Sequence, residues 1–401
     1  MARHWRLSAR FSLVLVLLLA LSGCAAPQQG AAPKAATKEP IKLGALFDLT
    51  GATADVGVPH AEGVRAYIGY INSKGGVNGR PIQLVEVDYA YKVPNAVEAY
   101  KKLVEQDKVV AMFGWGTGDT EALKEFISRD KIPFTSGSFA ESLANPAQTP
   151  YNFLVAPTYS QAARIGLDWA KSKKADAKVA MVYNDTAYGK SPLEDAKAYA
   201  RKIGLTWVGE VVVDLTAADA TTQVLELQRL GAEYVLIQET TNATAVTLKS
   251  AQKQGLLGKI QFIGLQYSTD ENLVKAADTA AEGFVGIPAF AFPYEEMAAR
   301  AEITEYLRTK NETLESKNQK WIQGWAFGKI MVEGVRRAGD TVTGESIKAA
   351  LETFKDFDLG GLGSPLTFTA TDHAGAKKAR VYQVKAGKWQ PITDWLEPQA
   401  K

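Results

Sequence analysis

The sequence is poor in the residues that build covalent cross-links and metal centres. It contains one cysteine and three histidines in 401 residues. A single cysteine cannot form an intramolecular disulfide, so the fold has no covalent staple of that kind. The histidines, His4, His60 and His373, are far apart in the sequence and have no metal-ligand spacing. A G-x-S-x-G nucleophile motif is also missing. We therefore expect a protein that is not an enzyme, with no catalytic residue, metal or cofactor.

The sequence also has little net charge. It contains 46 Lys and Arg against 44 Asp and Glu residues, and Arg3, Arg6 and Arg10 fall in the first ten positions. The remainder is close to neutral, which excludes the basic surface typical of nucleic-acid binding. Beyond residue 23, no apolar run reaches the ~20 residues that a membrane-spanning helix needs.

What the chain does have is a start typical of a secretory signal peptide. Three arginines and no acidic residue precede the apolar stretch Phe11–Leu21, and small residues follow it. The stretch is too short to span a bilayer of ~30 Å as a helix. We expect residues 1–23 to be removed on export, which would leave Cys24 as the first residue.

The residues around this cysteine add a second expectation. Leu21-Ser22-Gly23-Cys24 resembles the bacterial lipobox, which implies cleavage before Cys24 and a lipid on its thiol. Residues 24–40 are small and polar with several prolines, as in a flexible tether. We expect an exported protein that is lipid-anchored to the outer face of the cell membrane or in the periplasm. An ordinary signal peptide with an incidental cysteine is the alternative.

From residue 41 onward, patterns typical of strands and helices alternate in two runs. The pattern predicts parallel sheets flanked by helices, and hence two Rossmann-like α/β lobes. A late helix pair and a final hairpin turning at Ala386-Gly387 complete the chain. The expected strands are 41–47, 81–89, 109–114 and 132–137 in the first run and 177–183, 206–213, 234–238 and 260–265 in the second, with the hairpin at 378–392. The expected helices are 58–76, 94–106, 120–130, 192–204, 221–231, 242–255, 321–338 and 346–354.

Several stretches resemble one family. GALFDLTGATADVG (44–57) and INSKGGVNGRPIQLVEVD (71–88) are similar to the type I periplasmic binding proteins. More narrowly, they resemble the leucine/isoleucine/valine-binding branch of the ABC-transporter substrate-binding proteins. YNDTAYGKSPLEDAKAYARKIG (183–204) and AAEGFVG (280–286) extend the resemblance over roughly residues 41–396.

The resemblance implies two lobes joined by three hinge strands, with a ligand cleft between the lobes that closes on binding. The first lobe would comprise residues 41–157 plus 288–370, and the second would comprise 158–287 plus 371–401. The hinges would lie near Val155–Tyr159, Val285–Phe290 and Thr369–Gly375.

The most informative loop is MFGWGTGDTEALKEF (112–126), in which a strand ends, glycines follow and a helix begins. Thr117, Asp119 and Thr120 are candidate N-caps, and free N–H groups at a helix start favour an anion. A plain turn remains an alternative, whereas the spacing departs from the dinucleotide motif G-x-G-x-x-G. The family resemblance implies that Thr117, Gly118 and Thr120 hold a ligand carboxylate.

The resemblance also implies ligand contacts elsewhere in the cleft. They come from Ser138, Phe139, Tyr188 and Thr240, while Trp115 could stack on the ligand or pack within its lobe.

One loop departs from the family pattern. Where amino-acid binders of this branch commonly offer an acid to the ligand's ammonium, the chain has Gln266 with Tyr267 beside it. An uncompensated buried ammonium is costly. Asp270 or Glu239 could replace the missing acid, or the ligand could lack an ammonium.

Together these observations predict a monomeric, extracytoplasmic substrate-binding lipoprotein of an ABC importer. It would deliver a small carboxylate-bearing ligand, first of all a branched-chain or other hydrophobic amino acid, to a membrane permease. Aromatic or short-chain carboxylic acids or amides without an ammonium are the alternative ligands. A sensory ligand-binding module and an exported hydrolase are the alternative functions.

Overall fold

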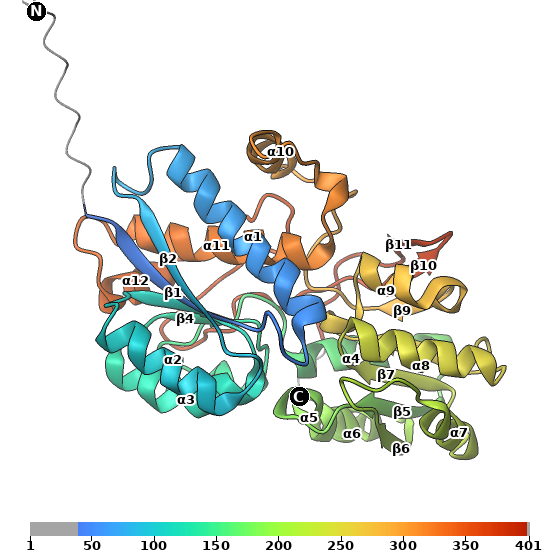
Figure 1. Ribbon diagram of the computed structural model, residues 1–401. Coiled ribbons are helices and arrows are strands. Elements are labelled where there is room, and N and C mark those ends of the chain that lie inside the picture. Colours follow the sequence, from blue (N-terminus) through green and yellow to red (C-terminus); the bar gives the residue numbers. More distant parts are fainter. Residues whose placement is uncertain (1–38, 399–401) are drawn as a thin grey trace, which may run out of the picture. The chain divides into compact units, whose positions relative to one another are not determined.

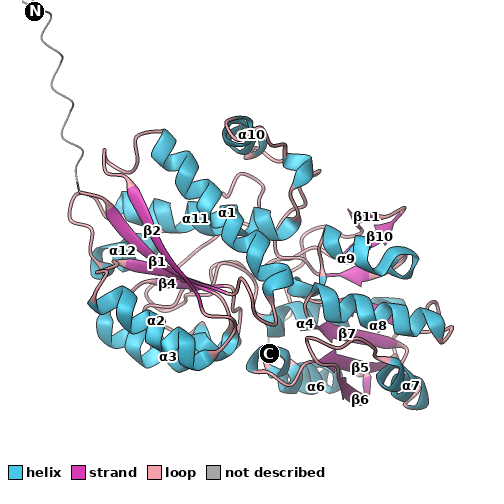
Figure 2. Cartoon of the chain, in the orientation of Figure 1, coloured by secondary structure: helices cyan, strands magenta, loops and turns pink. Residues whose placement is uncertain are grey.

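The computed structural model describes residues 39–398 of the chain. The predicted signal peptide, Cys24 and nearly all of the predicted tether lie outside the described residues. The described part contains two α/β lobes, each built around one sheet with helices beside it (Figures 1 and 2). No helix within it is both long and apolar enough to cross a membrane.

The first sheet is wholly parallel, as predicted. Its four strands lie in the order β2-β1-β3-β4, so that β1 and β3 are central. The strands are β1 (Ile41–Phe47), β2 (Ile82–Asp88), β3 (Ala111–Gly114) and β4 (Phe134–Ser136). The helical segments of this lobe are α1 (Ala54–Ser73), α2 (Val93–Glu105), α3 (Thr117–Asp130), η1 (Glu141–Leu143), α10 (Arg300–Arg308), η4 (Leu314–Ser316), α11 (Gln319–Arg337) and α12 (Gly344–Leu351).

The second sheet is mixed, because its parallel strands carry the predicted final hairpin at one edge. Its order is β11-β10-β9-β8-β7-β5-β6, and the antiparallel hairpin β10–β11 extends the parallel strands at one edge. The strands are β5 (Lys178–Tyr183), β6 (Thr206–Val212), β7 (Tyr234–Gln238), β8 (Gln261–Gly264), β9 (Val285–Gly286), β10 (Tyr382–Lys385) and β11 (Lys388–Pro391). The helical segments are α4 (Tyr159–Lys173), α5 (Ala187–Lys190), α6 (Leu193–Lys202), α7 (Thr221–Arg229), α8 (Thr241–Lys253), η2 (Gln266–Ser268), α9 (Glu271–Ala277) and η3 (Asp278–Ala281).

The predicted turn of the final hairpin is confirmed. Lys385 pairs with Lys388, and the two residues between them, Ala386 and Gly387, have φ angles of 51° and 72°. Two successive positive φ angles are the signature of the two-residue turn whose twist matches that of a hairpin.

The helix predictions were incomplete. Helices α4, α5, α9 and α10 were not predicted, and α1 begins at Ala54 rather than near Val58. The start of α4 carried a readable signal, since Thr158 and Gln161 form a capping box. The Thr158 hydroxyl accepts the Gln161 N–H at 3.1 Å, and the Gln161 side chain accepts the Thr158 N–H at 2.8 Å.

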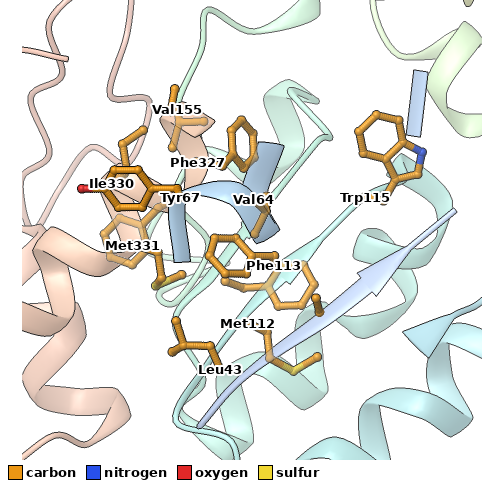
Figure 3. Close-up of a cluster of buried hydrophobic side chains, with 14 of the residues drawn as sticks. Leu43, Val64, Tyr67, Met112, Phe113, Trp115, Val155, Phe327, Ile330 and Met331 are labelled. Carbon is orange, nitrogen blue, oxygen red and sulfur yellow. The ribbon is translucent and has the colours of Figure 1, made fainter. Parts of the chain in front are cut away.

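Two long helices of the first lobe pack backbone to backbone behind the site. A Cβ atom on Gly63 of α1 would lie 2.1 Å from the Trp321 carbonyl oxygen of α11, and one on Gly324 would lie 2.0 Å from the His60 carbonyl oxygen. Glycine is therefore required at both contacts. Figure 3 shows the apolar cluster beside this contact, which includes Phe113 of β3 and extends toward Trp115. The core thus reaches the strand end where the candidate site begins.

Candidate ligand-binding site

A small cavity lies at the carboxyl ends of the strands of both lobes. It encloses about 240 Å³ of empty space including its open mouth, and the centre of a water molecule can occupy about 20 Å³ of this space. The carboxyl edge of such sheets is where open α/β folds bind ligands. The lining residues are Thr53, Val56, Tyr91, Trp115, Gly116, Thr117, Gly137, Tyr159, Tyr188, Thr240 and Tyr267.

Five of the ten residues predicted to bind ligand line this cavity: Trp115, Thr117, Tyr188, Thr240 and Tyr267. The other five, Gly118, Thr120, Ser138, Phe139 and Gln266, do not line it. Sequence reasoning missed the lining residues Thr53, Val56, Tyr91, Gly116, Gly137 and Tyr159. Three of them could have been found, because Thr53 and Tyr91 follow the predicted strands 41–47 and 81–89, and Gly137 ends the predicted strand 132–137.

The N-cap of helix α3 lies one residue before the first of the three predicted candidates. Its N-cap is Gly116, not Thr117, Asp119 or Thr120. The Gly116 N–H donates to the Asp119 carboxylate at 3.2 Å, and the Thr120 hydroxyl donates to the Gly116 carbonyl at 2.6 Å. A Cβ on residue 116 would lie 2.2 Å from Asp119 Oδ1, so glycine is needed there. The first-turn N–H groups, those of Thr117 and Gly118 among them, have no acceptor within the helix.

Hydroxyl groups surround this helix start. The Thr117 and Ser138 hydroxyl oxygens lie 2.8 Å apart, and both side chains are buried. Trp115 donates through Nε1 to the Thr53 hydroxyl at 2.8 Å, and this hydroxyl donates to the Asp48 carboxylate at 2.7 Å. Because the indole is held by hydrogen bonds inside the first lobe, Trp115 is a fixed wall of the cavity.

Tyrosines form the opposite wall. The hydroxyls of Tyr159 and Tyr267 both donate to the Gly137 carbonyl, at 3.1 and 2.6 Å, and Tyr188 donates to the Glu239 carbonyl at 3.0 Å. Burial raises the pKa of Tyr188 and of Tyr267 well above the ordinary value, so both hydroxyls stay neutral.

The ring packing leaves little space between these tyrosines. Tyr267 stands edge-on to Trp115 at 5.4 Å between centroids, and Tyr159 stands edge-on to Tyr188 at 5.3 Å. Phe139 supports this wall from behind, since its ring stacks on that of Tyr267 at 6.0 Å.

Gln266 also faces away from the cavity. Its Nε2 donates to the Pro157 carbonyl at 2.9 Å, and only 2% of the residue is exposed. The backbone carbonyl oxygen of Gln266 accepts a hydrogen bond from Lys320 Nζ at 2.6 Å, and Lys320 is fully buried. Burial lowers the pKa of Lys320 to about 8.

The carboxylates near the site are engaged by the protein. Asp270 accepts the Thr241 hydroxyl at 2.9 Å and caps α9 through the Leu273 N–H at 2.7 Å. Glu239 accepts Asn184 Nδ2 at 2.9 Å, and burial raises the pKa of its carboxyl well above the ordinary value. Neither residue lines the cavity.

Comparison with known proteins identifies the family. A model of the family described as periplasmic binding protein matches residues 40–388. The chain belongs to this family. Among curated proteins, Leu/Ile/Val-binding protein homolog 7 of Brucella abortus is 29% identical over 252 residues. That alignment covers 59% of this chain and 61% of the relative, less than two thirds of its length.

Solved structures resemble the chain over nearly all its length. One is a branched-chain amino acid ABC transporter protein from Thermus thermophilus with bound valine, which is 27% identical with a TM-score of 0.85. The match covers 90% of this chain and 97% of that one. Another is a fatty acid ABC transporter substrate-binding protein from Thermomonospora curvata, 25% identical with a TM-score of 0.78, covering 90% and 93%.

These matches confirm the predicted family, the α/β fold class and the expectation of a binding protein rather than an enzyme. The names of these solved structures refer to ABC transporters, and the description of the family refers to the periplasm.

Proposed function

We propose that this binding protein captures a small carboxylate-bearing ligand with an apolar body for an ABC importer. The observation that carries the proposal is the asymmetry of the cavity. One end has the start of α3 and the Thr117 hydroxyl, which suit a carboxylate, and the remaining wall is mostly aromatic.

The size of the cavity favours a short ligand. The centre of a water molecule can occupy only about 20 Å³ of it, against the roughly 300–1,000 Å³ typical of sites for drug-sized molecules. The relatives' names include valine, the Leu/Ile/Val group and fatty acids, all of which combine a carboxylate with an apolar body. Hydrophobic amino acids and short carboxylic acids without an amine are therefore the two classes to compare.

Closure of the two lobes is the proposed mechanism, because hydrogen bonds cross between them beside the cavity. Tyr267 of the second lobe donates to Gly137 of the first, and the Asn242 N–H of α8 donates to the Asp55 carboxylate of α1 at 2.9 Å. A ligand that touches both walls would stabilise this arrangement over an open one.

The proposed lobes are residues 41–157 plus 288–370 and residues 158–287 plus 371–401. Backbone hydrogen bonds support three crossings. At the first crossing, the backbone of Leu154 is hydrogen-bonded to residues 373 and 375. At the second crossing, the backbone N–H of Ile287 donates to the second lobe, whereas that of Ala291 donates to the first. Gly375 bonds to the first lobe and Ala379 to residue 396, so the third crossing would lie just after the predicted segment Thr369–Gly375.

We further propose that a lipid on Cys24 anchors a monomer beside its permease. A Cys24→Ala variant should then leave the membrane fraction of cells and lose the lipid mass, while binding ligand normally. Retention of the variant in the membrane would refute the anchor.

The ligand proposal is tested with protein that lacks residues 1–24. Hydrophobic amino acids and short carboxylates are screened by thermal shift, followed by calorimetry. A ligand at ~100 times its Kd should stabilise the fold by ~2.7 kcal/mol. Trp115→Ala and Tyr188→Ala should weaken binding while the far-UV circular dichroism is unchanged. Unchanged affinity in both variants would place the ligand elsewhere.

A further inference from the structure

We propose that the cavity selects small apolar monocarboxylates that lack an ammonium group. This inference rests on the proposed function and narrows its ligand class. The hydrogen-bond donors and acceptors around the cavity distinguish the two ligand classes, because a carboxylate needs donors whereas an ammonium needs about three acceptors.

The donors are available at one end of the cavity. Gly116 and Thr117 line it where α3 begins, and the N–H groups of the first helical turn have no acceptor inside the helix. The Thr117 and Ser138 hydroxyls lie 2.8 Å apart and both also face the Tyr159 hydroxyl, so a ligand oxygen would take one proton of the pair in exchange for Tyr159. A carboxylate would therefore meet backbone N–H and hydroxyl donors here.

The carbonyl acceptors beside the cavity are occupied by the protein's own donors. The Gly137 carbonyl accepts two tyrosine hydroxyls, those of Tyr159 and Tyr267. The Glu239 carbonyl accepts the hydroxyls of Tyr188 and of Ser268, at 3.0 and 2.8 Å. A ligand ammonium would have to displace these hydroxyls.

The protein also carries an ammonium of its own at this place. Lys320 is fully buried, and its Nζ donates to the carbonyls of Gln266 and Thr269 at 2.6 and 3.1 Å. The same Nζ lies 5.1 Å from the ring centroid of Tyr267, a residue that lines the cavity. A ligand ammonium beside this wall would lie near the like charge of Lys320. The nearby carbonyl acceptors would already be occupied.

No charged side chain lines the cavity, whose eleven lining residues include one tryptophan and four tyrosines. Among the acceptor atoms without a hydrogen-bond partner in the described part of the chain, Thr240 Oγ1 belongs to a lining residue, whereas Glu239 and Gln266, whose Oε1 atoms have no partner, do not line the cavity. One hydroxyl oxygen falls short of the three acceptors that an ammonium needs. Burial raises the pKa of the Glu239 carboxyl well above its usual range, which weakens it as a counter-charge for an ammonium. Glu239 is nevertheless the competing candidate that the experiment has to exclude.

The test compares ligands that differ only in the amine. Calorimetry at pH 7 with the purified protein uses 3-methylbutanoate against valine and 4-methylpentanoate against leucine. In each pair we expect the amine-free acid to have a Kd at least about ten-fold lower. The neutral 3-methylbutanamide should bind more weakly than 3-methylbutanoate, because the site is built for an anion.

Two variants complete the test. Glu239→Gln should leave the preference unchanged, because Glu239 takes no part in it, and Trp115→Ala should weaken every ligand that uses this cavity. Tighter binding of valine or leucine, with loss in Glu239→Gln, would overturn the inference and leave the proposed function standing. Tighter binding of the amide would also overturn it. Failure of all these ligands to bind would overturn the proposed function and the inference together.

Discussion

The two walls of the cavity are held in different ways. On the first-lobe wall, the Trp115 side chain is hydrogen-bonded to Thr53, and the Thr117 side chain is hydrogen-bonded to Ser138. Both contacts lie within one lobe. On the second-lobe wall, the hydroxyl of Tyr267 reaches across to Gly137. The donors for a carboxylate therefore exist in either state of the protein, whereas the aromatic enclosure depends on closure. Substitutions on the first-lobe wall should therefore weaken contacts with the ligand, whereas substitutions on the second-lobe wall should weaken closure.

The largest effect is expected at the point where the walls meet. A Cβ on Gly137 would lie 2.8 Å from the Tyr267 hydroxyl and 2.8 Å from the Trp115 ring. Gly137→Val should push the walls apart and lower ligand affinity by about 100-fold, since overpacking costs about 1–3 kcal/mol. Calorimetry with the tightest ligand from the screen measures this effect.

Gly118→Ala is the matched control. A Cβ on residue 118 of α3 has its nearest neighbour, Val93 Cγ2, at 3.5 Å. This variant should bind normally and gain up to about 1 kcal/mol of stability from helix propensity. If both variants bind equally well, Gly137 is not part of a closed site.

The second comparison separates closure from packing. Tyr267→Phe removes one of the two tyrosine hydroxyls that join the lobes at Gly137, the other being that of Tyr159. It also leaves Gln323 Nε2, which lies 2.9 Å from the Tyr267 hydroxyl oxygen, without its acceptor. The closed state should lose about 1–3 kcal/mol, which would weaken binding about ten-fold. Small-angle scattering should show a larger mean radius of gyration without ligand.

Tyr188→Phe is the control for this pair. Its hydroxyl bonds to the Glu239 carbonyl inside the second lobe, and this carbonyl keeps the Ser268 hydroxyl as a donor at 2.8 Å. The affinity should change less than about three-fold. A larger loss in Tyr188→Phe than in Tyr267→Phe would contradict the assignment of closure to Tyr267.

A smaller effect is expected from the first-lobe wall. Thr117→Val keeps the β-branched shape at the start of α3 and removes the hydroxyl that faces Ser138. Loss of one hydrogen-bond donor to the carboxylate should cost about 1 kcal/mol, or about five-fold in Kd, without changing closure. Because the two hydroxyls act as a pair, adding Ser138→Ala should cost little more. Additive losses would show that they act independently.

The sequence predicted the layers of the fold better than the details of the site. Strand ends and glycines locate the cavity edge, because parallel strands end together. Sequence could not show that Gln266 turns to Pro157, since this contact depends on packing between segments 109 residues apart. The family resemblance placed Tyr159 in a hinge, and nothing local indicates that its hydroxyl reaches Gly137.

The smallest effect concerns pH and the contact that joins α1 to α8. Burial raises the pKa of Asp55 from 3.8 to about 6, the nearby Asp270 adds to the rise, and the Asn242 N–H opposes it. If an open state exposes this carboxyl and lowers its pKa, the closed state binds the proton more tightly. The stabilising contribution is then present at low pH and is lost as the pH rises through about 6. Affinity should increase a few-fold from pH 7.0 to 5.5, as measured by calorimetry. Asp55→Asn keeps an acceptor for Asn242 and should flatten this dependence, whereas an unchanged slope would assign it to another group.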